Sequence, residues 1–119
     1  PYVYSQFCAA KPSPHYGEGA YHWLTGTAAW MFRAVTDYML GVQPTDDGLR
    51  LNPCLPPGFT SYRMVRRFRG AVYHITVDNP EDRRTGTPQI TVDDEAVDGP
   101  VIPLQPAGTE CRVQVTLNG

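Results

Sequence analysis

Several features that would place the chain in other protein classes are missing from its 119 residues. No apolar run approaches the roughly eighteen residues that a membrane-spanning helix needs, so we expect a soluble chain with no membrane partner. The sequence also begins at Pro1 without an initiator methionine, a basic signal region or a small-residue cleavage site. We therefore interpret it as the tail end of something longer.

Cysteine is scarce and widely spaced. The three cysteines, Cys8, Cys54 and Cys111, are odd in number and form no C-x-x-C pair. This usage favours a reducing cytoplasm and ordinary burial over disulfides or a zinc site. The histidines lack metal-ligand spacing as well, so we expect a cytoplasmic protein with no metal and no cofactor.

An excess of one charge is also missing, since the formal net charge is −2. This balance gives no bulk attraction to nucleic acid. Four arginines nevertheless cluster beside Tyr62 and Phe68, and basic residues among aromatic ones are typical of grooves for single-stranded nucleic acid. Strand alternation is the simpler explanation, with Tyr62, Met64, Arg66 and Phe68 on one face and Arg63, Val65, Arg67 and Arg69 on the other. We therefore expect no nucleic-acid partner.

One helix is predicted from Thr27 to Leu40, because this stretch has no proline or glycine and Gly41 follows where a glycine commonly ends a helix. Its broad apolar face is formed by Ala28, Met31, Phe32, Val35, Tyr38 and Met39, extended by Trp30, Ala34 and Leu40. Only Arg33, Thr36 and Asp37 form a polar strip. Such a helix needs apolar neighbours on both sides, and the chain supplies few of them.

The start of this helix is a candidate anion site. The first N–H groups of a helix have no intrahelical partner and carry partial positive charge, so they can bind a phosphate. Gly26 allows close approach and tolerates unusual backbone angles, and the Thr25 hydroxyl can donate a further hydrogen bond. The alternative is that Thr25 or Thr27 is an ordinary N-cap, and the two interpretations are compatible.

The beginning of the chain can contribute to the same site. Residues 2–10 suggest a short helix after Pro1, and a loop rich in proline and glycine then returns the chain to Trp23. That return would bring the Gln6 amide close to Thr25, and an amide can donate two hydrogen bonds to phosphate. His22, directly before the proposed turn, is a candidate for binding substrate.

The second half of the chain has strand periodicity. Alternation predicts strands over residues 71–78, 89–92, 101–104 and 111–117, with Val113, Val115 and Leu117 marking a core face and His74 on the surface. Asp- and Gly-rich turns between them indicate a small antiparallel sandwich. The carboxylates of those turns, Asp93, Asp94, Glu95 and Asp98, lack calcium-loop spacing and are interpreted as solvated.

Four blocks in order along the chain resemble the C-terminal part of the glycoside hydrolase family 94 phosphorylases, the group of cellobiose and chitobiose phosphorylases. The blocks are residues 1–6 (PYVYSQ), residues 23–30 (WLTGTAAW), residues 40–54 (LGVQPT, DGL and NPC) and residues 68–80 (FRGAVYHI to NP). Residues 101–104 (VIPL) resemble the closing segment of the family.

The resemblance implies an α+β chain with two domains. Residues 1–43 would be the last helices of an (α/α)6 barrel catalytic domain, and residues 44–119 a small C-terminal antiparallel β-sandwich. In this family a glutamine and an adjacent Thr-Gly pair bind inorganic phosphate, which implies phosphate binding by Gln6, Thr25 and Gly26. The other phosphate ligands, a histidine and an arginine, and the aspartate general acid would lie upstream, so no catalytic residue is expected in this chain.

The implied reaction is inverting phosphorolysis of a β-linked, cellobiose-like disaccharide, with inorganic phosphate as a substrate. Residues 18–22 (EGAYH) depart from the family pattern, which leaves the acceptor sugar open; an aldonic acid is one alternative. Glu18 is interpreted as a solvent-exposed loop residue.

Two other roles stay open for the β portion. It would be a carbohydrate-binding module with a sugar platform of Tyr62, Phe68 and Tyr73, or a structural module that closes the barrel or forms a homodimer contact.

Overall fold

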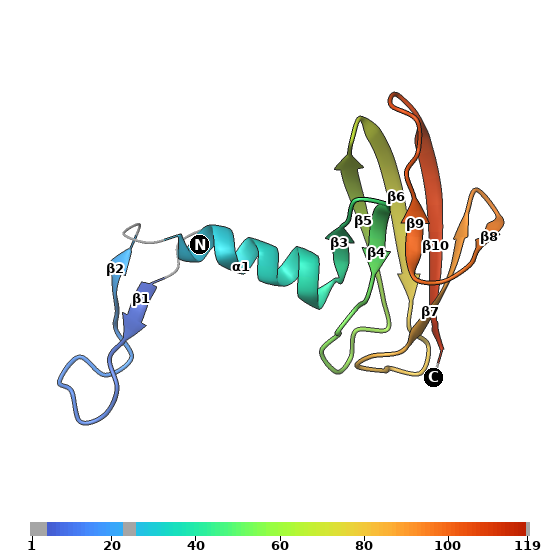
Figure 1. The fold of residues 1–119 in the computed structure, drawn as a ribbon. Coiled ribbons are helices and arrows are strands. Elements are labelled where there is room, and N and C mark those ends of the chain that lie inside the picture. Colours follow the sequence, from blue (N-terminus) through green and yellow to red (C-terminus); the bar gives the residue numbers. More distant parts are fainter. Residues whose placement is uncertain (1–4, 23–25, 119) are drawn as a thin grey trace. The chain divides into compact units, whose positions relative to one another are not determined.

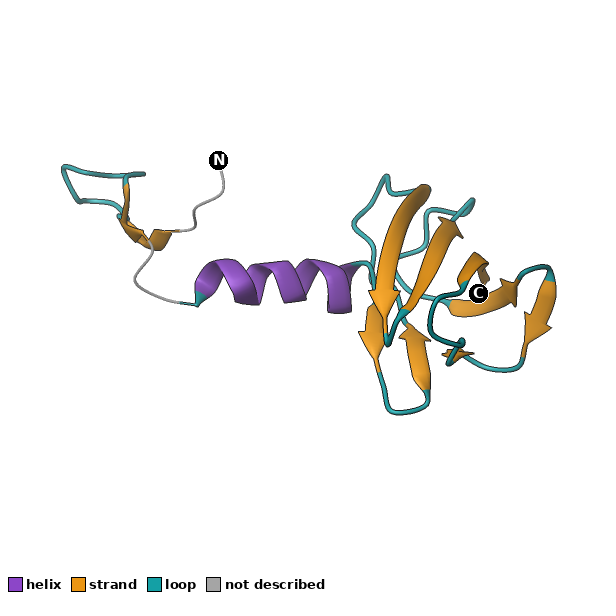
Figure 2. Ribbon diagram, turned by 90° about the horizontal axis from the view of Figure 1, so that it is seen from above, coloured by secondary structure: helices purple, strands orange, loops and turns teal. Residues whose placement is uncertain are grey.

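The computed structural model describes residues 5–22 and 26–118. The chain forms two compact units, Pro1–Ala34 and Val35–Gly119. The described part of the first unit contains an antiparallel hairpin of β1 (Ser5–Cys8) and β2 (Gly19–His22), followed by helix α1 (Thr27–Arg33). Helix α1 is followed directly by a π-helical segment, η1 (Ala34–Met39). Ala34 is the last residue of the first unit, and the other residues of η1 begin the second unit. Strands and loops make up the rest of it (Figure 2).

The short helix expected over residues 2–10 is wrong where the structure describes it, because Ser5–Cys8 is a strand paired with β2. The connecting loop is closed by backbone hydrogen bonds from Ala9 N to Glu18 O and from Gly17 N to Ala9 O, each 2.9 Å long. The rings of Phe7 and Tyr21 lie 5.5 Å apart across the hairpin. Pairing with a strand further along the chain therefore overrides the helical pattern of a short segment.

The helix predicted from Thr27 is confirmed, and Gly41 adopts the left-handed φ of 71° expected after a helix. Its last turn is π-helical, with Leu40 N bonded to Val35 O at 2.8 Å. Large apolar side chains stand exposed on it, with Trp30 70%, Phe32 65% and Tyr38 61% exposed. The buried residues of η1 are instead the polar Thr36 and Asp37. The (α/α)6 barrel and the domain boundary at residue 43 stay predictions.

The second unit contains two sheets. One has five strands in the order β5-β6-β10-β7-β8, and the other has three in the order β3-β4-β9 (Figure 1). The strands of the five-stranded sheet are β5 (Ser61–Phe68), β6 (Ala71–Asp78), β7 (Thr87–Val92), β8 (Glu95–Val97) and β10 (Glu110–Asn118). Those of the three-stranded sheet are β3 (Val42–Pro44), β4 (Gly48–Leu51) and β9 (Val101–Pro103).

Two sequence expectations for these sheets need correction. The five-stranded sheet is mixed, not antiparallel, because β10 runs parallel to β6 with Val113 opposite Ile75. Arg69 does not share a strand face with Arg67. With Gly70 it forms the turn between β5 and β6, at φ values of 48° and 86°. Two consecutive positive φ angles are the geometry of a tight hairpin turn.

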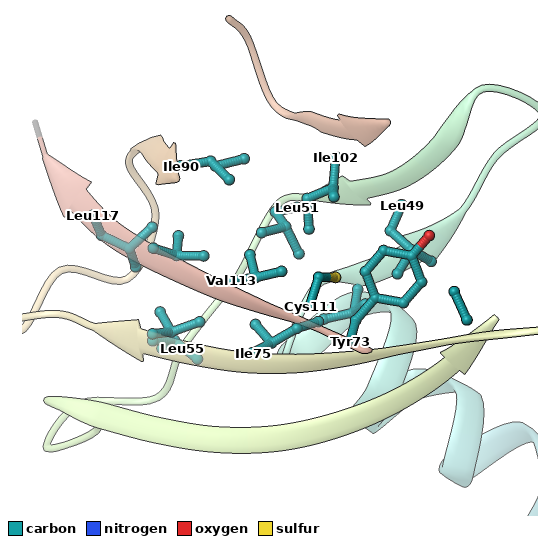
Figure 3. Packing of buried hydrophobic residues seen from close by; sticks show 14 residues of the cluster. Leu49, Leu51, Leu55, Tyr73, Ile75, Ile90, Ile102, Cys111, Val113 and Leu117 are labelled. Carbon is teal, nitrogen blue, oxygen red and sulfur yellow. The ribbon is translucent and has the colours of Figure 1, made fainter. Parts of the chain in front are cut away.

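The core lies between the two sheets (Figure 3). The predicted inward face of residues 111–117 is confirmed, since Val113, Val115 and Leu117 are all buried, and His74 is exposed as expected. The three-stranded sheet contributes Leu51 and Ile102 to the same cluster. Burial of both inner faces is what makes this unit a β-sandwich.

The remaining structural expectations are confirmed only in part. Cys111 is buried as expected, whereas Cys8 and Cys54 are exposed in the described chain. The turn carboxylates of residues 93–98 are exposed, and Asp93 accepts a hydrogen bond from the Arg112 N–H at 2.9 Å. Glu18 is exposed and lies 3.1 Å from the His15 Nδ1 atom. None of the described helices is both long and apolar enough to cross a membrane.

Candidate functional site

Gly26 is the N-cap of α1, and its carbonyl accepts the first helical hydrogen bond from Trp30 N at 2.9 Å. A glycine offers no side chain to cap the first turn, and no side-chain cap hydrogen bond is made here. Its φ of −72° is ordinary, so the unusual backbone angles that the sequence suggested are not used here. The proposal that Thr27 is the N-cap is also wrong, because Thr27 is the first helical residue.

Gln6 lies in β1 with an exposed side chain. Its neighbour Ser5 pairs with His22, the last residue of β2. The hairpin thus brings the strand of Gln6 beside β2, which holds the last described residues before Gly26. Thr25 lies outside the described residues, as does the side chain of His22. The closeness of Gln6 to Thr25 therefore stays a prediction.

The sequence did not identify a polar cluster at the other end of the helix. In η1, the Thr36 hydroxyl donates to Asp37 Oδ1 at 2.9 Å, and Arg66 Nη2 of β5 lies 4.0 Å from the same oxygen. The Tyr62 hydroxyl donates to the Leu40 carbonyl at 2.5 Å. Two features pointed to this cluster: a polar strip on an otherwise apolar helix, and an arginine on the inward face of a strand.

Burial raises the pKa of the Tyr62 hydroxyl above its ordinary value, because the phenolate would lose its hydration. The hydroxyl therefore remains a hydrogen-bond donor over the pH range in which enzymes are normally assayed. The pKa of the Cys111 thiol is raised as well, mainly by burial and further by the negative charge of Asp93.

The Tyr62 shift predicts a dependence of stability on alkaline pH. Below about pH 10 both folded and unfolded states keep the proton, and above it the unfolded chain ionises first. The free energy of unfolding should then fall as pH rises, with a contribution from Tyr62 of about 1.4 kcal/mol per pH unit. Tyr62→Phe lacks this hydroxyl and therefore lacks this loss of stability. The difference in the free energy of unfolding between wild type and Tyr62→Phe should then shrink between pH 9 and 11, roughly the range in which tyrosine ionises.

Urea denaturation at several pH values checks this expectation. Tyr16→Phe, which alters an exposed tyrosine, is the matched control. Parallel stability curves for wild type and Tyr62→Phe would contradict the assignment of the alkaline loss to this hydroxyl.

The proposed sugar platform is wrong. Tyr73 is completely buried, and its hydroxyl oxygen accepts a hydrogen bond from Gln105 N at 3.0 Å. Tyr62 and Phe68 are half-buried and pack against the core. Three aromatic rings in these positions cannot form one exposed stacking surface. Among residues 5–22 and 26–118, no three His, Cys, Asp or Glu side chains converge in a way that would hold a metal ion.

Comparison with known sequence families divides the chain at the end of the helix. Residues 1–41 match the "Glycosyl hydrolase 94 superfamily, catalytic domain", and residues 42–98 match the "Glycosyl hydrolase family 65, C-terminal domain". The first 41 residues thus match a catalytic-domain family, and residues 42–98, which include the first strands of the β-rich unit, match a C-terminal-domain family.

Similar proteins make the assignment more specific. The chain is 41% identical to an N,N'-diacetylchitobiose phosphorylase of Vibrio furnissii over 98% of its length and 14% of that relative. It is 38% identical to a solabiose phosphorylase and 36% identical to a 3-O-beta-D-glucopyranosyl-beta-D-glucuronide phosphorylase, both of Paenibacillus borealis, over 98% of the chain and 15% of each relative. The chain belongs to the glycoside hydrolase family 94 phosphorylases as their C-terminal part, and spans about one seventh of the length of these relatives.

Proposed function

We propose that this segment supplies part of the inorganic phosphate site of an inverting phosphorylase that cleaves a β-linked disaccharide. The products would be a sugar 1-phosphate and a free sugar. The observation that carries the proposal is the helix start at Gly26, which lies within the stretch that matches the catalytic domain. A phosphate at a helix start accepts hydrogen bonds from N–H groups that have no intrahelical partner.

Neutral donors suit a phosphate that must react. In inverting hydrolysis one carboxylic acid protonates the leaving oxygen and one carboxylate activates water. Phosphate is already an anion, so one of its oxygens would attack the anomeric carbon while the glycosidic bond breaks and the leaving oxygen takes a proton from an upstream acid. The donors of Gln6, Thr25 and the Gly26 N–H would hold that oxygen in line.

The exposed apolar side chains of the helix support a further part of the proposal. Trp30 and Phe32 are about two-thirds exposed in this chain, although aromatic side chains of this size usually contribute to cores or interfaces. We assign this surface to contact with the remainder of the same polypeptide. The general acid and most sugar subsites would lie there, so the isolated segment should bind little disaccharide and show no turnover.

Thr25→Val in the intact enzyme tests the phosphate site. A hydrogen bond to a charged group contributes about 1.5–3 kcal/mol, so we expect kcat/KM for phosphate to fall about 10- to 100-fold. Initial rates at varied phosphate and saturating disaccharide measure this effect. Thr25→Ser, which keeps the hydroxyl, should retain most of the activity. Wild-type phosphate dependence in Thr25→Val would remove this residue from the site.

The acceptor sugar needs a separate measurement, because relatives of similar identity carry names with different substrates. Sugar 1-phosphate release from cellobiose, diacetylchitobiose, solabiose and a glucosyl-glucuronide would assign the specificity. We propose His22, at the end of β2, as a substrate-binding residue. His22→Ala should then change the relative rates among these sugars, and a uniform change across them would contradict this role.

A further inference from the structure

Tyr21 has a backbone conformation that is unusual for a strand. Its φ is 56°, and among the described residues other than glycine it alone combines a positive φ with a place inside a strand. A bulky side chain makes this left-handed conformation unfavourable, whereas glycine or asparagine adopts it at lower cost. The Tyr21 side chain is 60% exposed in this chain, so its burial does not offset the strain. Strained residues of this kind cluster at functional sites.

The hairpin of β1 and β2 bends sharply at Tyr21. Ser5 pairs with His22, which lies three residues from Gly19 on β2, a separation of about 10 Å along a regular strand. A Cβ on Gly19 would nevertheless lie 2.8 Å from Ser5 Oγ and 2.9 Å from Ser5 Cβ. Between these positions Gln6 and Tyr21 lie opposite one another without pairing, although the residues on either side of them are paired. The two strands therefore fold over at this point.

Two further features stabilise the bend. Gly19 has no side chain, so it leaves room for the Ser5 side chain, whose Cβ cannot rotate out of the way. The rings of Phe7 and Tyr21 lie 5.5 Å apart with 51° between their planes, which is a favourable arrangement for two aromatic side chains. The bend is thus specified by the left-handed backbone of Tyr21, by the glycine and by the ring pair.

Gln6 lies at this bend. Its position in β1 is opposite Tyr21, and its side chain is exposed. The local direction of a strand determines where each of its side chains points. The bend therefore sets the direction of the Gln6 amide, and a straighter hairpin would point the same amide elsewhere.

We propose that Tyr21 and Gly19 are positioning residues for the phosphate site: the bend that they allow in the hairpin directs the Gln6 amide toward the phosphate. This inference rests on the proposed function of Gln6. A misplacement of about 1 Å can reduce a reaction rate by about 100-fold, so a straightened hairpin would lose the Gln6 hydrogen bond although Gln6 itself is kept. Both residues act through Gln6 and need no contact with the substrates.

Kinetics of the intact phosphorylase at varied phosphate test the role of Tyr21. Tyr21→Val introduces a β-branched residue, for which a positive φ is a genuine outlier, and Tyr21→Asn introduces a residue that tolerates it. We expect the KM for phosphate to rise about tenfold in Tyr21→Val and to stay within about threefold of wild type in Tyr21→Asn, because one hydrogen bond to a charged group accounts for roughly tenfold or more in affinity. The KM for disaccharide should stay near the wild-type value in both. Equal phosphate KM values in the two variants would overturn the role of the left-handed conformation.

A rescue experiment tests the bend by a second route. Gly19→Ala should raise the phosphate KM about tenfold, because the new Cβ collides with Ser5 and the Gln6 hydrogen bond is lost. Adding Ser5→Gly removes both colliding atoms and should return the phosphate KM to near the wild-type value, with Ser5→Gly alone as the matched control. The nearest atom that remains, the Phe7 carbonyl oxygen, lies at an ordinary contact distance of 3.7 Å. A double variant no better than Gly19→Ala would contradict the positioning role, and this route decides the matter should Tyr21→Val fail to fold.

Gln6→Ala separates this inference from the proposed phosphate site, with all variants assayed well below the melting temperature of the least stable one. Its phosphate KM sets the upper limit for the positioning variants, which can lose only what Gln6 contributes. If Gln6→Ala raises the phosphate KM while Tyr21→Val and Gly19→Ala do not, only the positioning role fails. If Thr25→Val raises it and Gln6→Ala does not, Gln6 is no ligand and the positioning role fails with it. If neither variant has an effect, the proposed phosphate site fails.

Discussion

Replacing Gly48 by alanine should lower the free energy of unfolding by about 2–6 kcal/mol, because backbone strain and steric overlap each cost about 1–3 kcal/mol. Gly48 begins β4 at a φ of 155°, which side chains rarely adopt. A Cβ there would lie 1.9 Å from the Ile102 carbonyl oxygen. Ile102 is completely buried in the core, so neither strand can move aside without losing packing. Chemical denaturation followed by circular dichroism measures the loss.

Gly58→Ala separates the two causes. Gly58 also has a positive φ, 87°, but a Cβ there would meet no atom within 4 Å. Its substitution should therefore cost only the strain of a left-handed residue, about 1–2 kcal/mol. Equal losses in the two variants would show that collision with the β9 backbone is not the cause at Gly48.

The strands of the sandwich were predictable because alternation directly reports which side chains face the core. Tyr73, Ile75 and Val77 alternate with more exposed residues, and the structure buries all three. The partner of each strand was not predictable from the same pattern. Alternation is identical for parallel and antiparallel neighbours, so the parallel pairing of β10 with β6 depends on contacts between residues far apart in the sequence.

Short segments show the limit of local patterns more sharply. Ser5–Cys8 was expected in a helix, yet it pairs with Gly19–His22. Four residues can satisfy either period, and a strand partner more than ten residues away decides between them. At Gly19, a Cβ would lie 2.8 Å from Ser5 Oγ, which indicates how closely the two strands approach there.

The candidate site was also predictable only in part. The helix start at Gly26 was predictable, because cap residues and the following apolar period are encoded locally. The cluster of Asp37 and Arg66 was not, because it joins a helix and a strand that local patterns treat separately. Each segment alone nevertheless contained an indication of this cluster, because a charged residue on a face that is expected to be buried requires a partner.

Asn79→Ala should lower the free energy of unfolding by at least about 3 kcal/mol, since unpaired buried polar groups cost about 1–3 kcal/mol each. Asn79 is completely buried after β6. Its Nδ2 donates to the carbonyls of Phe59 and Arg83, and its Oδ1 accepts from Arg83 N, all at 2.9 Å. Asn52→Ala, which removes an exposed side chain, is the control and should change stability little. A loss in Asn79→Ala no larger than in this control would contradict the structural role of the amide.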